Sequence, residues 1–325
     1  MTASSHTADT ADTADTADTA DTADTADAAH TAQTAPTAAL AQTAPTAALA
    51  QTAATAALTQ TAATTASAQT AHTARAHSFN AAAAQYAANR PSYPTALLDA
   101  IEGLAGHPLT GARVADIGAG TGIATALLHA RGAHVLAVEP GDGMTEQFRR
   151  TLPDVPIVRG DGNRLPLAAD SLDFLTYAQS WHWTDPARSV PEALRVLRPG
   201  GALALWWNTY ALDVPWIAAQ TDRIGAHFAA FAAHPSVEVN GSGARAALVD
   251  PTGRLNFTFR LVRWSRHVPV DTHLANIGSH SVFLVAGEER TTAFLTEERE
   301  HLREVFPDGV VEETYEVELL VAAKA

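Results

Sequence analysis

The chain has 325 residues, a net charge of −14 at pH 7 and no cysteine. The charge argues against a nucleic-acid partner, and the lack of cysteine excludes disulfides, thiolate metal sites and a cysteine nucleophile, so we predict no metal site. No apolar run approaches the roughly 18–20 residues that span a bilayer, and the N-terminus lacks the basic start and apolar stretch of a secretory signal. We therefore expect a cytoplasmic protein without a membrane partner.

Residues 1–74 are of low complexity. Ala, Asp and Thr repeat with a period of three from Ala8 to Asp27, and Thr-Ala-rich variants continue to Ala74. The segment contains no aromatic residue, so it cannot bury enough apolar surface to offset the entropy lost on folding. We predict a disordered tail over 1–74 and a folded domain over 75–325. The alternative is a transient helix or a surface-binding arm.

The folded part is expected to begin with a helix over 79–86. It ends before the extended segment Arg90–Pro94, because a residue that precedes proline avoids helical angles. A second helix is expected over 95–104, since Leu97, Leu98 and Ile101 fall on one face of it.

Strands and helices then alternate. The sequence predicts apolar strands at 113–117, 134–138, 155–159, 172–177 and 202–207, and intervening helices at 123–131, 143–151 and 186–197. This alternation predicts an α/β fold in which a mostly parallel sheet is covered by helices on both faces. Later strands are expected at 255–264 and 310–322, and short helices at 270–277 and 296–305.

A helical pattern over 214–231 interrupts this alternation after the fifth strand. We predict that residues 208–252 form a lid insertion, with Trp216 and Phe228 facing a small, partly apolar substrate. The alternative is that this apolar stripe packs on the sheet.

A glycine-rich turn follows the first predicted strand in the segment Val114–Gly122. Glycine allows a sharp turn and a close approach to a ligand, and the helix that follows offers N–H groups of partial positive charge. A strand, a glycine turn and a helix in this order predict a nucleotide-type site. The dinucleotide fingerprint would have glycine where Ile123 stands, and no Lys-Ser/Thr pair follows as in a P-loop. An NAD-type dehydrogenase is therefore the weaker alternative.

Other strand ends should meet the glycine turn, because a ligand of a parallel sheet lies beyond the carboxyl ends of the strands. Glu139 ends the second strand and can accept hydrogen bonds from both ribose hydroxyls. Asp161 follows the third strand and can accept from an adenine amino group, while Gly162 lets the ring approach. The alternatives are a solvated acid for Glu139 and a plain Asp-Gly turn for Asp161.

The fourth strand ends in the segment Gln179–Trp183, in which two tryptophans flank a histidine. A lone histidine is more often structural than catalytic, but one between tryptophans at a predicted cleft is a catalytic candidate. We therefore select His182 together with Trp183.

These stretches together resemble the type-11 group of class I S-adenosylmethionine (SAM)-dependent methyltransferases, close to the trans-aconitate and juvenile-hormone-acid methyltransferase-like subgroup. The resemblance covers about residues 78–325 and leaves the tail unmatched. The segments that carry it are Tyr86 with Arg90–Pro94, Asp116–Gly122, Glu139-Pro140, Gly160-Asp161 with Leu165-Pro166, Gln179 with His182-Trp183, and Leu194–Gly201.

The resemblance implies a Rossmann-like, seven-stranded sheet with SAM as the cofactor. It implies that Asp116, Gly118 and Gly120 lie at the amino-acid end of SAM. It also implies that the backbone carbonyl of Gln179 lies near the methionyl amine. It further implies that Glu139 holds the ribose, that Asp161 and Gly162 contact the adenine, and that Tyr86 and Arg90 close over the cofactor.

The expected reaction is methyl transfer to a small molecule, at a carboxylate or hydroxyl oxygen. In the first role, His182 is the base that a hydroxyl acceptor needs, because histidine titrates in a suitable range. In the second role, the acceptor is a carboxylate that needs no base, and His182 with Trp183 orients it. The subgroup favours the second role. A non-catalytic SAM-binding or adaptor module is the alternative function.

Overall fold

The computed structural model describes residues 87–228 and 249–325, all of which belong to one unit, Gln60–Ala325. The predicted tail over 1–74 lies outside the described residues. So do the helix expected over 79–86, with Tyr86, and residues 229–248 of the predicted insertion.

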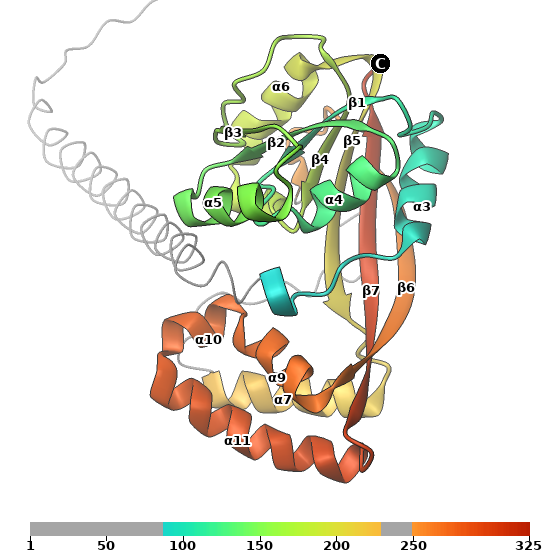
Figure 1. The fold of residues 1–325 in the computed structure, drawn as a ribbon. Helices are drawn as coiled ribbons and strands as arrows, with labels where there is room; N and C mark the ends of the chain where they lie inside the picture. Colours follow the sequence, from blue (N-terminus) through green and yellow to red (C-terminus); the bar gives the residue numbers. More distant parts are fainter. Residues whose placement is uncertain (1–86, 229–248) are drawn as a thin grey trace, which may run out of the picture. The chain divides into compact units, whose positions relative to one another are not determined.

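Seven strands form one sheet (Figure 1): β1 (Arg113–Ile117), β2 (His134–Glu139), β3 (Ile157–Arg159), β4 (Leu172–Ala178), β5 (Leu197–Tyr210), β6 (Thr258–Pro269) and β7 (Val310–Ala323). Their order is β3-β2-β1-β4-β5-β7-β6, and β7 alone runs in the direction opposite to the other six strands. The predicted mostly parallel sheet is thereby confirmed. Because β1 to β5 are parallel, their carboxyl ends share one edge, and the strand order reverses there between β1 and β4.

Helices cover both faces of this sheet, as predicted. The first face carries α3 (Thr95–Ala105), α4 (Ile123–Ala130) and α5 (Asp142–Thr151), and the second carries α6 (Pro186–Val196). Side chains of one strand alternate between the two cores, so that Phe174 of β4 belongs to the first and its neighbour Leu175 to the second. Strands buried on both faces explain why the sequence reads as continuous apolar runs.

A separate apolar core lies among α7 (Pro215–Phe228), α9 (Val270–Gly278), α10 (Ser281–Ala286) and α11 (Glu288–Val305). We call these four helices the helical cluster (Figure 1). Their shared core includes Phe228, Ile277, Phe283, Phe294 and Leu302. None of the described helices combines the length and apolar character needed to cross a bilayer.

The helical cluster differs from the predicted insertion, because residues between β6 and β7 supply most of it. The sequence predicted neither α10 nor the first two turns of α11, whose Glu-rich and Thr-rich start has no apolar periodicity. Trp216 packs edge-on against His273 and Phe306, with ring centres 5.6 and 5.2 Å apart. Trp216 and Phe228 thus contribute to packing within the cluster.

Buried polar groups connect the helical cluster to β7. The Glu313 carboxylate of β7 is 2% exposed and accepts hydrogen bonds from Arg266 at 2.5 Å and from Asn276 at 3.3 Å. His273 lies 2.7 Å from the same carboxylate. Burial alone would raise the pKa of Glu313, but its contacts with His273 and Arg266 outweigh burial and lower it to about 2. This carboxylate therefore stays ionised inside the protein.

We predict that Glu313→Gln destabilises the chain and alters its acid denaturation. A carboxylate whose folded pKa lies below the unfolded value stabilises the fold above the unfolded pKa, and this stability is lost as pH falls from 4.5 towards 2. The shift corresponds to about 3 kcal/mol at neutral pH. Urea unfolding at pH 7 and below pH 4 measures both effects.

The exposed neighbour supplies the control, since Glu312→Gln on the same strand should change the free energy of unfolding by less than about 0.5 kcal/mol. Equal losses in the two variants at pH 7 would contradict the buried role of Glu313.

Candidate functional site

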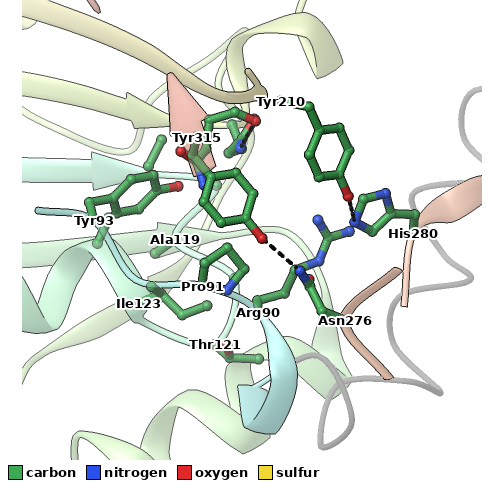
Figure 2. Close-up of a pocket in the computed structure, with 16 residues that line it drawn as sticks. Arg90, Pro91, Tyr93, Ala119, Thr121, Ile123, Tyr210, Asn276, His280 and Tyr315 are labelled. Atoms are coloured by element: carbon green, nitrogen blue, oxygen red, sulfur yellow. Dashed lines mark hydrogen bonds between the residues drawn. The ribbon is translucent and has the colours of Figure 1, made fainter. Parts of the chain in front are cut away.

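A cavity opens at the carboxyl edge of the parallel strands, where the strand order reverses. It encloses about 650 Å³, part of which is open solvent. Figure 2 shows that its side chains come from distant parts of the chain. The lining consists of Arg90, Pro91, Tyr93, Gly118, Ala119, Gly120, Thr121, Ile123, Ala124, Ala178, Gln179, Asn208, Tyr210, Asn276, His280 and Tyr315.

The glycine turn between β1 and α4 forms one wall of this cavity. Gly118, Gly120 and Gly122 have φ values of +65°, +58° and +94°, in the left-handed region that favours glycine. The N–H groups of Gly118 and Ala119 donate to the Val138 carbonyl at 2.8 and 3.2 Å, which fixes the turn against β2. A Cβ at Gly118 would lie 2.6 Å from Ser180 Cβ, whereas one at Gly120 would meet nothing within 4 Å. The backbone at Gly120 is therefore open to a ligand.

Asp116 lies beneath the turn and is fully buried. Its carboxylate accepts hydrogen bonds from Thr125 Oγ1 at 2.6 Å and Thr176 Oγ1 at 3.0 Å. Burial raises its pKa to about 6. The hydrogen bonds from the two hydroxyls act in the opposite direction, and the Glu139 charge adds a smaller increase. The structure places Asp116 behind the cavity wall and not in its lining.

Glu139 is also buried and connects the ends of β1 and β2. Its two carboxylate oxygens accept hydrogen bonds from the N–H of Gly120 at 2.9 Å and of Gly141 at 2.8 Å. Burial raises the pKa of Glu139 because it outweighs these two backbone donors and the charge of Arg159. A carboxylate has about four acceptor positions, so it can accept ribose hydroxyls while it holds the turn.

Asp161 and Gly162 lie in an exposed turn after β3. Asp161 Oδ1 accepts from the Asn163 N–H at 2.6 Å, which is the local bond of an Asx turn. Gly162 is packed closely, since a Cβ there would lie 2.9 Å from Thr184 Cγ2. Neither residue is in the lining of the cavity.

Gln179 directly follows β4 and lines the cavity. Its φ of +58° is rare for a residue with a Cβ and marks a constrained backbone. The conformation is held by a hydrogen bond from its N–H to the Trp206 carbonyl at 2.9 Å and one from Nε2 to the Asn208 carbonyl at 3.3 Å. The sequence predicted a role for Gln179 but gave no sign of its left-handed backbone.

His182 and Trp183 form a short 3₁₀ turn, Trp181–Trp183, instead of continuing the strand. His182 is exposed and outside the lining of the cavity. Its Nδ1 accepts a hydrogen bond from Trp207 Nε1 at 3.2 Å. A neutral ring in this arrangement carries its proton on Nε2, so it offers a donor there.

A second wall, which we call the distal wall, consists of Arg90, Tyr210, Asn276, His280 and Tyr315. Figure 2 shows these side chains converging. They come from the segment before α3, from β5, α9 and β7, and from the segment before α10. Sequence reasoning missed the last four, because no local spacing connects residues that lie up to about a hundred positions apart. Arg90 was predicted to close over the cofactor. Its Nη2 donates to the carbonyl of Ser279, the residue that caps the C-terminus of α9, at 3.3 Å.

The polar groups of the distal wall are held in their neutral forms, apart from Arg90. Burial raises the pKa of Tyr210 and of Tyr315. Burial lowers the pKa of His280 well below its usual value, and the charges of Arg90 and His273 act in the same direction. Tyr210 Oη and His280 Nε2 are 3.4 Å apart, and their rings are stacked.

Comparison with known proteins identifies the central part of the chain. Residues 115–205 match the family described as a methyltransferase domain. An uncharacterised methyltransferase of Mycobacterium tuberculosis is 43% identical over 148 residues, which are 46% of this chain and 59% of that protein. A demethylmenaquinone methyltransferase of Clavibacter sepedonicus is 39% identical over 102 residues, or 30% of this chain and 42% of that one. The chain thus spans less than two thirds of the length of these relatives.

A solved structure extends the likeness beyond the matched segment. A putative type II methyltransferase from Anaeromyxobacter dehalogenans has a TM-score of 0.57 and 26% identity, over 72% of this chain and 97% of that one. These findings support the predicted resemblance to class I SAM-dependent methyltransferases. They do not extend to the trans-aconitate and juvenile-hormone-acid subgroup. The chain therefore has the Rossmann-like methyltransferase fold, and its residues 115–205 match the methyltransferase-domain family.

Proposed function

We propose that this chain transfers a methyl group from SAM to an oxygen of a small-molecule acceptor. The observation that carries the proposal is the cavity at the switch point, where the open backbone of Gly120 and the constrained Gln179 lie on one lining. The match to a methyltransferase domain supports both the reaction and the cofactor. When bound, SAM supplies an electrophilic methyl group on a sulfonium that is a good leaving group.

The proposal includes narrower parts that the sequence predicts. They are a catalytic domain over 75–325, a cytoplasmic location, no nucleic-acid partner, and membership of the trans-aconitate and juvenile-hormone-acid subgroup. Residues 208–252, together with α9 to α11, would cover the acceptor side.

The proposed cofactor residues act mainly by position. Gly118 and Gly120 would take the amino-acid end of SAM, beside the carbonyl of Gln179 and above the buried Asp116. Glu139 would accept the ribose hydroxyls, because its carboxylate keeps acceptor positions beyond its two N–H bonds. Asp161 and Gly162 would contact the adenine from the turn after β3. Tyr86 would close the site together with Arg90.

His182 is proposed to orient the acceptor, with Trp183 beside it. The tautomer favoured by the Trp207 hydrogen bond supports a donor at Nε2, which suits a carboxylate oxygen better than it suits proton removal. The two rings lie 4.9 Å apart between centres, so Trp183 can fix the orientation of the imidazole.

We predict that the wild-type chain binds SAM and that Gly120→Ala weakens this binding more than tenfold. The substitution adds a methyl group where the lining is open, at a φ of +58°. Gly253→Ala is the matched control, because Gly253 has a φ of +64° and equally open surroundings but is not in the lining of the cavity. Both variants should lose about 1–2 kcal/mol of stability from backbone strain.

Titration calorimetry with SAM measures the affinity, and thermal unfolding checks the fold. The function would be contradicted by a folded wild-type chain that does not bind millimolar SAM. The place of the cofactor would be contradicted if Gly253→Ala weakened binding as much as Gly120→Ala.

The affinity for SAM should fall in acid. A nearby cation favours the ionised form of Asp116, whose pKa is about 6 in the free chain. Binding below that pH must release a proton, so the dissociation constant should rise about tenfold between pH 7.5 and pH 5. Asp116→Asn should remove most of this pH dependence. A smaller dependence in the same direction should remain, because the pKa of Glu139 is also raised. Identical pH profiles in the variant and the wild type would exclude Asp116 from the linkage.

The role of His182 can be read from a pH profile of methyl transfer. For a donor that orients the acceptor, we expect His182→Ala to lower kcat/KM about 10- to 100-fold, by the same factor from pH 6.5 to 9. For a base, rising pH would restore activity, because solvent would accept the proton more readily. Steady-state rates with labelled SAM distinguish the two, and rescue at high pH would overturn the orienting role.

A further inference from the structure

The distal wall lies outside the segment that matches the methyltransferase family. Its five residues come from before residue 115 or after residue 205, whereas the glycine turn and Gln179 lie inside the match. The family match therefore does not account for what this wall recognises. One of its side chains, Asn276, has a buried oxygen that no group in the described part of the chain satisfies.

We propose that Asn276 determines substrate specificity by accepting a hydrogen bond from a neutral hydroxyl of the methyl acceptor. This hydroxyl is a second functional group of the acceptor and not the atom that is methylated. The inference rests on the proposed methyltransferase function and specifies what its substrate must carry. It follows from the burial of Asn276, the orientation of its amide, the charge of the lining and the lack of a base.

Two asparagines are among the described residues that line the cavity, and their amide oxygens differ. Asn208 Oδ1 accepts a hydrogen bond from Trp264 Nε1 at 3.0 Å. Asn276 is 1% exposed, yet its Oδ1 has no hydrogen-bond partner among the described residues. A buried acceptor without a donor is uncommon in native proteins, so the oxygen of Asn276 is an atom that calls for a ligand.

The hydrogen bonds made by the nitrogen of Asn276 fix the orientation of its amide. Nδ2 donates to Tyr315 Oη at 3.0 Å (Figure 2) and to the Glu313 carboxylate at 3.3 Å. An ionised carboxylate can only accept, so the nitrogen and not the oxygen must face Glu313. Both hydrogens of Nδ2 are thereby used, and Asn276 has only an acceptor left to offer. It therefore favours ligand groups that donate and disfavours a carbonyl or carboxylate oxygen.

The charge of the lining favours a neutral donor over a cationic one. Arg90 is the one charged side chain among the described residues of the lining, which include no aspartate or glutamate to offset it. A protonated amine on the acceptor would be repelled by this guanidinium, and by the sulfonium of SAM when the cofactor is bound. A hydroxyl donates a hydrogen bond without carrying a charge.

Other groups of the distal wall also suit a hydroxyl. Tyr210 and His280, both neutral, have two polar hydrogens between them, and the contact of 3.4 Å between Oη and Nε2 uses one. In either tautomer of His280 the pair therefore keeps one hydrogen to donate. A hydroxyl both donates and accepts, which matches a wall that offers an acceptor and a donor, whereas an amide N–H can only donate.

A hydroxyl bound at this wall keeps its proton, and for that reason it is not methylated. An amide oxygen accepts a hydrogen bond but is too weak a base to remove the proton. The described lining has no carboxylate, and the low pKa of His280 makes its imidazole a weak base. Because a protonated hydroxyl is a poor nucleophile, the methyl group must go to another oxygen of the same molecule.

A ligand without the hydroxyl should bind less well than one that has it. An ether or an alkyl group at this place excludes water from Asn276 Oδ1 and does not replace the hydrogen bond that water can donate. The amide oxygen then stays buried and unpaired, which should weaken binding about 10- to 100-fold. The wall thus rejects analogues through the penalty that it imposes on its own oxygen.

The first experiment tests the requirement for the hydroxyl with the full chain. Methyl transfer from labelled SAM is measured on hydroxy acids and diols, each paired with the compound that lacks one hydroxyl and with the methyl ether of that hydroxyl. We expect kcat/KM to be about 10- to 100-fold higher for the hydroxylated member of a pair. Fragment masses should locate the new methyl group on the other oxygen.

The same pairs are titrated by calorimetry into the chain loaded with S-adenosylhomocysteine, which measures the preference without turnover. A chain that binds SAM but prefers no hydroxylated compound, in turnover or in binding, would overturn the inference. Methylation of the hydroxyl that distinguishes the pair would do the same. A chain that does not bind SAM would instead refute the proposed function.

The second experiment assigns the preference to one side chain. Asn276→Leu should reduce the ratio of kcat/KM within a pair to about one, because a leucine has no oxygen to leave unpaired. The dissociation constant of SAM should stay nearly unchanged. The control is Asn208→Leu, which makes the same change at an asparagine whose oxygen already has a donor. The ratio in this control should stay as large as in the wild type.

The ratio separates recognition from a purely structural role of Asn276. Structural damage would lower the rates of both members of a pair equally, so an unchanged ratio in folded Asn276→Leu would contradict the assignment. A large rise in the dissociation constant of SAM at an unchanged ratio would place the amide oxygen on the methionyl ammonium instead. Thermal unfolding shows whether each variant folds, and Asn276→Ala replaces Asn276→Leu if the leucine does not fit.

Discussion

The carboxylate of Glu139 holds the glycine turn in place, and the cavity depends on it. One oxygen accepts the Gly120 N–H at 2.9 Å and the other the Gly141 N–H at 2.8 Å, so a single buried group joins the loops that follow β1 and β2. The left-handed glycines let the chain turn, but they do not decide where the turn lies. The position of the turn is set by its hydrogen bonds to Glu139 and to the Val138 carbonyl. These bonds keep the backbone of Gly120 facing the open space.

A second buried carboxylate, Glu313, supports the opposite wall, and its pKa is shifted in the opposite direction to that of Glu139. Arg266 and His273 surround Glu313 and lower its pKa. The pKa of Glu139 is raised, because burial outweighs its two backbone N–H donors and the charge of Arg159. Glu313 also binds Asn276, which in turn donates to Tyr315, so the ionised network behind the wall orients two of its side chains. Each of the two walls of the cavity is thus supported from behind by a buried carboxylate.

Much of the sheet could be predicted from the sequence, and much of the helical cluster could not. β1 was predicted to the residue, and α3 and α4 to within one, because their apolar patterns are local. β5 extends beyond its predicted end to Tyr210, where it pairs with Tyr315 of β7. Because a strand distant in the sequence stabilises this extension, the local sequence has no pattern that predicts it. The start of α11 was missed for a related reason: its first turns are exposed, so packing further along the helix determines them.

The sequence by itself determined the fold class and the wall formed by the glycine turn, because a strand, a turn of alternating glycines and a helix are set by neighbouring residues. It also placed Glu139 and Gln179 at strand ends that a parallel sheet must bring together. Only the tertiary structure decided the distal wall, in which Arg90 meets Ser279 across 189 positions and Tyr210 meets His280 across 70. Such contacts exist because buried polar atoms need partners, and the fold chooses those partners by proximity in space, which spacing along the chain does not encode.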